Sequence, residues 1–235
     1  NPLDKIFSKK RKETSQKVDF VSGISEFILE QHLHKNYFKN AKSKVIYNGF
    51  DFRKEKRLKT PTNPIKFGFI GQVKEHKGIN LLLQTFIKLK TPNTRLLIAG
   101  KAEDELIHSY QNDPRIEFKG FMNAQDFFQE IDVLVVPSLW HEPFGRVVME
   151  ALVYHKAVIA SKMGGIPELL KNNPEFLFEP REKDLLDLMG KIVSDPKFLN
   201  NFQISSGFLE EFSLDSMVNQ YEAVYKTLIL RANEN

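Results

Sequence analysis

Two carboxylates eight positions apart, Glu142 and Glu150, are the residues of this sequence best placed to do chemistry. They follow an apolar run directly, so they belong at the carboxyl end of an expected strand, where open α/β sheets bind ligands. Pro143 suits the first turn of a helix, which would carry Glu142 at its mouth and Glu150 off its packed face. Such carboxylates can accept hydrogen bonds from sugar hydroxyls, while amides near Phe144 and Gly145 suit a phosphate. On these residues alone, Glu142 could equally be a helix-dipole partner and Glu150 a surface acid.

A loop bounded by Gly71 and Gly78 contains two lysines, Lys74 and Lys77, and a lysine here could neutralise a diphosphate as charge develops on it during bond cleavage. An ordinary polar loop is the alternative. Gly164 and Gly165 follow another apolar run and open a short helix, which predicts a second group of backbone donors.

The turn 119–122 could receive a base, although simple core packing also explains it. The sequence lacks the phosphate-loop, dinucleotide-binding, zinc-protease and serine-hydrolase motifs. It has no Cys, so disulfides and thiol chemistry are excluded.

Six short apolar runs have the length and composition of buried strands. They lie at 66–70, 95–99, 116–118, 132–137, 157–160 and 175–178. Helical patterns fill most gaps, including 79–89, and closing helices are expected at about 182–192, 196–210 and 214–230. This alternation predicts an α/β fold with a Rossmann-like parallel sheet and helices on both faces.

The first 60 residues form a separate small pattern. Residues 18–24 are strand-like, Ser25 is an expected N-cap for a helix at 26–34, and 45–49 is typical of half a hairpin. The charged segment 52–63 reads as a linker. We therefore expect 1–60 to be the remnant of another domain with its linker, and 61–235 to be the main domain.

The formal net charge is +4, but residues 1–60 carry +8 and the remainder −4. The basic blocks 9–12 and 53–57 indicate attraction to an anionic membrane surface or a charged substrate, or simply a solvated start and linker. Neither has the interleaved aromatic residues of a nucleic-acid site. No apolar run approaches the ~18–20 residues of a membrane span. We expect a soluble cytoplasmic protein, with peripheral contact at the inner membrane face as a further option, and the residue usage suggests a bacterium.

Together, the motifs resemble those of retaining glycosyltransferase family 4, the group 1 glycosyltransferases with the GT-B fold. The resemblance runs from about Asp19 to Tyr225 and rests on Glu142-x7-Glu150 within PSLW-x-EPFG, the Gly71–Gly78 loop, LLIAG at 96–100 and GGIPE at 164–168. It implies two Rossmann-like domains facing a cleft, a C-terminal half that binds a nucleotide-diphosphate sugar, and catalysis without a metal or cofactor.

The resemblance also implies residue roles. Glu142 and Lys77 would be catalytic: Glu142 would contact the donor sugar, and Lys77 the diphosphate. Glu150 would hold the ribose, and Phe121 would flank the base. The remaining donor-binding positions would be Gly71, Gln72, Phe144, Gly145, Gly164 and Gly165.

Two departures stand out. Many relatives have Arg where this chain has Gln72, which would leave more of the diphosphate charge to Lys77, with Lys74 as a possible helper. We also expect the chain to begin near the last strand and helix of an acceptor domain. We therefore expect the donor-binding half of a longer enzyme. The apolar stripe of the last helix, which includes Tyr221, Tyr225 and Ile229, would be poorly covered or engaged by another chain.

The function implied is retaining transfer of a hexose from a UDP-, GDP- or ADP-sugar to a glycan or lipid acceptor, as in polysaccharide or lipopolysaccharide biosynthesis. One alternative is a non-catalytic nucleotide-sugar-binding module that acts with a separate acceptor-domain partner. A more distant one is an epimerase of the non-hydrolysing type.

Overall fold

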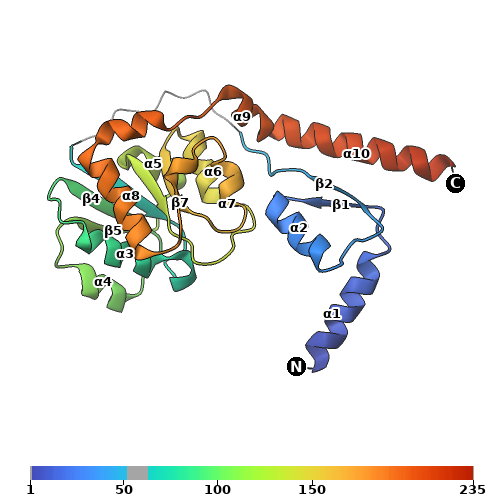
Figure 1. Ribbon diagram of the computed structural model, residues 1–235, viewed down its shortest axis with the longest axis horizontal. Helices are drawn as coiled ribbons and strands as arrows, with labels where there is room; N and C mark the ends of the chain where they lie inside the picture. The colour runs from blue at the N-terminus through green and yellow to red at the C-terminus, as the bar shows by residue number, and fades with distance from the viewer. Residues whose placement is uncertain (1, 52–62, 235) are drawn as a thin grey trace. The chain divides into compact units, whose positions relative to one another are not determined.

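The computed structural model describes residues 2–51 and 63–234 (Figure 1). They form two compact units, one of residues 2–51 with 206–234 and one of residues 63–205. The predicted linker falls almost wholly on 52–62, outside the described residues. Residues 206–234, which the sequence grouped with the main domain as its crossover helix, belong to the same unit as the N-terminal segment.

The larger unit is built on a six-stranded, all-parallel sheet, as the apolar runs predicted. Its strands are β3 (Ile65–Ile70), β4 (Thr94–Ala99), β5 (Ile116–Gly120), β6 (Val133–Val136), β7 (Ala157–Ser161) and β8 (Leu177–Phe178). The strand order is β5-β4-β3-β6-β7-β8, so the chain reverses its direction of winding between β3 and β6. Open α/β sheets bind ligands at such a switch point, because the loops after the two central strands diverge there.

Helices cover this sheet. They are α3 (Ile79–Lys88), α4 (Asp104–Tyr110), α5 (Ala124–Glu130), α6 (Arg146–Val153), α7 (Ile166–Leu169) and α8 (Glu182–Ser194), with 3-10 turns η1 (Glu75–Lys77), η2 (Pro174–Phe176) and η3 (Pro196–Asn201). Figure 1 shows α3 and α8 side by side, and their contacts agree. All four residues of β6 are buried, which explains its unbroken apolar run.

The helix predicted at 196–210 is wrong as one element. It is divided into η3 and α9 (Ser206–Glu211). Phe202 interrupts it, because its backbone is extended and its buried ring packs edge-on against Phe176 at 4.9 Å between centroids.

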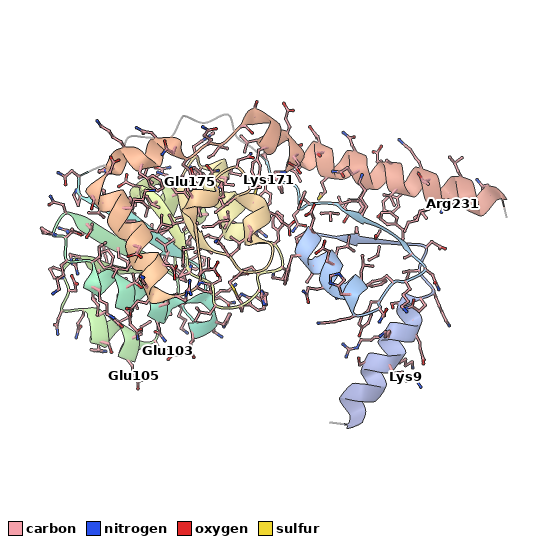
Figure 2. All side chains as sticks on the ribbon, viewed as in Figure 1. Lys9, Glu103, Glu105, Lys171, Glu175 and Arg231 are labelled. Carbon is pink, nitrogen blue, oxygen red and sulfur yellow. The ribbon has the colours of Figure 1, made fainter. Side chains whose placement is uncertain are left out.

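The smaller unit contains α1 (Pro2–Ser15), β1 (Phe20–Gly23), α2 (Glu26–His34), β2 (Lys42–Val45), α9 and α10 (Leu214–Glu234). Ser25 caps α2 as predicted, since its hydroxyl accepts a hydrogen bond from the Ile28 amide at 3.1 Å. The predicted half-hairpin at 45–49 is wrong: β2 pairs in parallel with β1, and α2 makes the crossover. The first basic block lies on α1, from which Lys9 projects into solvent (Figure 2).

The apolar stripe of α10 is only partly covered, as expected. Tyr225 and Ile229 are exposed, whereas Tyr221 is half-buried and its hydroxyl lies 3.2 Å from that of Ser22 on β1. Among the described helices, none combines the length and apolarity that crossing a bilayer requires.

Arg115 ties the start of β5 to the end of α3. Its guanidinium pairs with Asp113 at 2.7 Å, donates to the carbonyl of Leu89 and lies 4.9 Å from the centre of the Phe86 ring. The hydrogen bond from Arg115 is the main cause that holds the pKa of Asp113 below its ordinary value of 3.8.

We expect Arg115→Ala to lower the free energy of unfolding by about 1.5–3 kcal/mol near neutral pH, because the lost hydrogen bonds are charge-assisted. The pKa of Asp113 is lower in the folded state, so its share of that stability is present above 3.8 and is lost as the pH falls through the folded value. Urea unfolding of both proteins should therefore show a smaller difference near pH 3 than at pH 7. An equal difference at both would contradict a role for the ionised pair.

Candidate functional site

A cavity of about 530 Å³ lies at the switch point, beyond the ends of β3 and β6. It brings together most of the residues predicted for chemistry, although they come from two separate segments of the chain, 69–77 and 135–150. The lining residues that concern the site are Gly71, Gln72, His76, Lys77, Ser138, Trp140, Glu142, Gly145, Arg146 and Glu150.

Lys77 and Glu142 form the central contact of this cavity. The Lys77 Nζ atom lies 2.7 Å from Oε1 of Glu142, and their side chains are only 25% and 13% exposed. The Ser138 hydroxyl donates a second hydrogen bond to the same oxygen at 2.8 Å. Partial burial strengthens the attraction between the two charges, so the pair is fixed in place more firmly than a surface ion pair.

Close backbone packing sets this geometry. Gly78 has φ +77°, and a Cβ there would lie 3.1 Å from Cβ of Pro137 and still closer to its carbonyl, so only glycine lets the two loops meet. The Leu139 amide donates to the His76 carbonyl at 2.9 Å. The Trp140 ring adds to the contact, with its centre 5.0 Å from Nζ of Lys77.

The second predicted carboxylate, Glu150, lies on the same cavity but already has a cation. Arg146 Nε donates to Glu150 Oε1 at 2.8 Å, one helical turn away. The expectation that the helix begins at Pro143 is wrong: α6 starts at Arg146, because Gly145 before it adopts a left-handed φ of +96°. Glu150 is therefore one turn into the helix rather than two.

Three predicted contact residues have other places. Phe144 is 3% exposed, so its ring packs in the core, and it is outside the residues lining the cavity. Gly164 and Gly165 are outside the residues lining the cavity and support one of those residues from outside. The Gly165 amide donates to the carbonyl of Glu142 at 2.8 Å, so this turn holds the backbone that presents the carboxylate.

A second cavity of about 740 Å³ adjoins the first, and both are lined by Gly71 and Gln72. It continues past the ends of β4 and β5 to Phe121 and Met122, in the turn for which the sequence raised base binding. Phe121 is 92% exposed, so its ring presents a free apolar surface at this end. Glu103 at the N-cap of α4 also lines the cavity, and Figure 2 shows Glu103 and Glu105 at the N-terminal end of α4.

Lys119, at the start of the same turn, points elsewhere. Its Nζ lies 2.9 Å from Glu130 and 3.0 Å from Glu117, and the hydrogen bonds that Lys119 donates to these two carboxylates, Glu130 first, raise the pKa of Lys119. Lys119 thus forms ion pairs with Glu130 and Glu117 at β5.

Sequence reasoning missed Ser138, Trp140 and Arg146 as lining residues. All three stand inside the same motif as Glu142, so their position beside the carboxylates was a usable signal. The direction of the Arg146 side chain depends on where the helix begins, which the motif alone did not show.

A family model described as "Glycosyl transferases group 1" matches residues 51–206. A Klebsiella pneumoniae protein, described as an uncharacterized 42.6 kDa protein in the cps region, is 30% identical over 94% of this chain and 56% of its own length. The Escherichia coli O-antigen biosynthesis glycosyltransferase WclY is 25% identical over 82% of this chain and 58% of its own. The chain spans about half the length of the curated relatives it matches.

Solved structures share the fold. Anabaena HepE, crystallised with UDP and glucose, superposes with a TM-score of 0.76 at 20% identity, over 97% of this chain and 69% of that chain. The six-stranded parallel sheet and its helices thus have the architecture of GT-B glycosyltransferases. With a family model covering the cavity-forming segments and this fold beneath them, the chain belongs to the group 1 glycosyltransferases.

Proposed function

We propose that this chain is the donor-binding half of a retaining glycosyltransferase of family 4. It would bind a nucleotide-diphosphate sugar in the two adjoining cavities, for transfer of a hexose to a glycan or lipid acceptor in bacterial polysaccharide or lipopolysaccharide biosynthesis. The observation that carries this proposal is the Lys77–Glu142 pair at the switch point, with Glu150 on the same cavity. The UDP and glucose bound to HepE and the O-antigen role in the name of WclY support it.

Each site residue would contact a different part of the donor. Lys77 would bind the diphosphate and offset the charge that grows on it as the bond to the sugar breaks. Glu142 would accept hydrogen bonds from the sugar hydroxyls and orient the ring, while Glu150 would accept those of the ribose. The apolar end at Phe121 would receive the base, and Gly71 and Gln72 would line the passage between.

In this proposal the protein supplies positive charge to the leaving group from Lys77 and the backbone amides at the start of α6, so no metal or cofactor is assigned a role. The enzyme would work in the cytoplasm, with a membrane-face location as a further option.

A thermal-shift comparison of UDP-, GDP- and ADP-sugars tests the proposal most directly. One nucleotide class should raise the unfolding midpoint of the chain, because ligands that bind only the folded state stabilise it. If none of the three classes raises the midpoint, the proposal is wrong.

Calorimetry should show different effects on ligand affinity when Glu142 and Glu150 are each removed. Glu142→Ala should reduce the preference for the sugar nucleotide over the free nucleoside diphosphate about threefold to tenfold, since only the sugar contact is lost. Glu150→Ala should weaken both ligands by a similar factor, because both contain the ribose. Equal losses for both ligands in both variants would contradict this division.

A second candidate is a binding module that holds the same donor in these cavities and works with a separate acceptor-domain chain. Incubation of this chain alone with donor and a glycan or lipid acceptor distinguishes the two. Sugar transfer would exclude the module, whereas donor binding without transfer would favour it.

A further inference from the structure

Two cation–carboxylate pairs line the switch-point cavity, and the arginine of the second pair, Arg146, has no part in the function proposed above. Arg146 joins Glu150 at 2.8 Å, with side chains 82% and 28% exposed, while Lys77 joins Glu142 deeper in the site. Of the described residues that line the cavity, Lys77 and Arg146 are those with a permanent positive charge.

The position of Arg146 is unfavourable for a residue that serves only the helix. It is the first residue of α6, and a cation at that end opposes the helix dipole. Its partner lies four residues later, so the pair also has the weaker of the two i,i+4 orientations. An exposed pair of this kind contributes little to stability, so the guanidinium can change partners at small cost.

The same end of α6 suits an anion. The amides of Arg146 and Val147 come before the first hydrogen bond of the helix, which Val148 donates to the Gly145 carbonyl, and a positive helix end attracts phosphate. A diphosphate carries at least two negative charges, of which Lys77 can offset one. The planar guanidinium of Arg146 can bind phosphate oxygens in a bidentate manner.

We propose that Arg146 is the second diphosphate-binding cation of this site and that it reaches the ligand by leaving Glu150. The exchange has two results at once: it neutralises the diphosphate, and it frees the Glu150 carboxylate to accept the ribose hydroxyls. Arg146 thus holds Glu150 in the empty site and binds the ligand in the filled one. This inference rests on the proposed function.

Calorimetry on the full chain tests it, with whichever of UDP, GDP and ADP stabilises the unaltered protein and with the matching nucleoside. Arg146→Gln should weaken the diphosphate roughly threefold to tenfold and leave the nucleoside unchanged or bound more tightly, since Glu150 is then free. Arg146→Lys should lie between, because it keeps the charge but loses the bidentate contact. The matched control is Arg181→Gln, which removes another exposed arginine paired with an acid at a helix start, 2.7 Å from Asp184 and away from both cavities.

A second variant separates ligand binding from mere orientation of Glu150. In a Glu150→Gln background, Arg146→Gln should still weaken the diphosphate if the guanidinium contacts it. Loss of that effect in the Glu150→Gln background, an equal effect on the nucleoside, or no effect at all would each overturn the inference. If the unaltered chain binds none of the three diphosphates, the proposed function fails together with it. If the unaltered chain binds but Arg146 has no selective effect, the inference alone fails.

Discussion

Lys77→Ala should weaken binding of a nucleoside diphosphate about 10- to 150-fold, corresponding to about 1.5–3 kcal/mol for a lost charge-assisted hydrogen bond. The effect should be large because the Lys77 side chain is three-quarters covered and lies in a cavity, where charges are poorly screened. Calorimetry with the diphosphate and with the corresponding nucleoside measures it, and the nucleoside should lose little.

The control is Lys88→Ala on α3. Lys88 also pairs with a glutamate, Glu182, at 2.6 Å, but on an exposed surface outside both cavities. Its removal should leave diphosphate binding unchanged. Unaltered affinity in Lys77→Ala would contradict the assignment of Lys77 to the diphosphate.

Gly164→Ala should disrupt the site by displacing the backbone that carries Glu142. Gly164 has φ +63°, and a Cβ there would lie 2.6 Å from the Glu142 amide nitrogen and still closer to its carbonyl oxygen. Both atoms belong to backbone and cannot turn aside, so the segment that carries Glu142 must shift. We expect a loss of at least about 2 kcal/mol in the free energy of unfolding, since the left-handed conformation and the clash act together. Diphosphate binding should fall as well.

Gly190→Ala is the matched control for this substitution. Gly190 lies within α8, and a Cβ there would meet no atom within 4 Å. Alanine should therefore stabilise the chain, by up to about 1 kcal/mol, because it is the better helix former. Urea unfolding compares the two variants, and equal stabilities would contradict the steric account of Gly164.

The strands could be predicted because each buried parallel strand appears as a short, unbroken apolar run between turn residues. Residues 132–137 are an example, since β6 is buried on both faces. The cavity could be anticipated for a related reason: the loops after parallel strands open on one edge of the sheet, so the Gly71–Gly78 loop and the Glu142 segment had to approach each other.

What could not be predicted depends on backbone conformation or on distant packing. The left-handed Gly145 delays α6 to Arg146, and that shift determines which side chains face the cavity. The parallel pairing of β1 with β2 depends on contacts between segments, which a turn signal at Asn48 does not report. The supporting role of Gly165 arises from a hydrogen bond to a residue 23 positions earlier.

Gly71 lies where the two cavities meet and adds no side chain to their boundary. It lines both, and the space where a side chain would begin is empty to 4 Å. A long molecule can therefore lie across this saddle with one end in each hollow, whereas its halves, taken apart, would occupy the hollows independently. Any side chain at this position would rise as a partition between the two hollows. The open boundary at Gly71 thus favours one molecule that joins two unlike groups over two separate molecules.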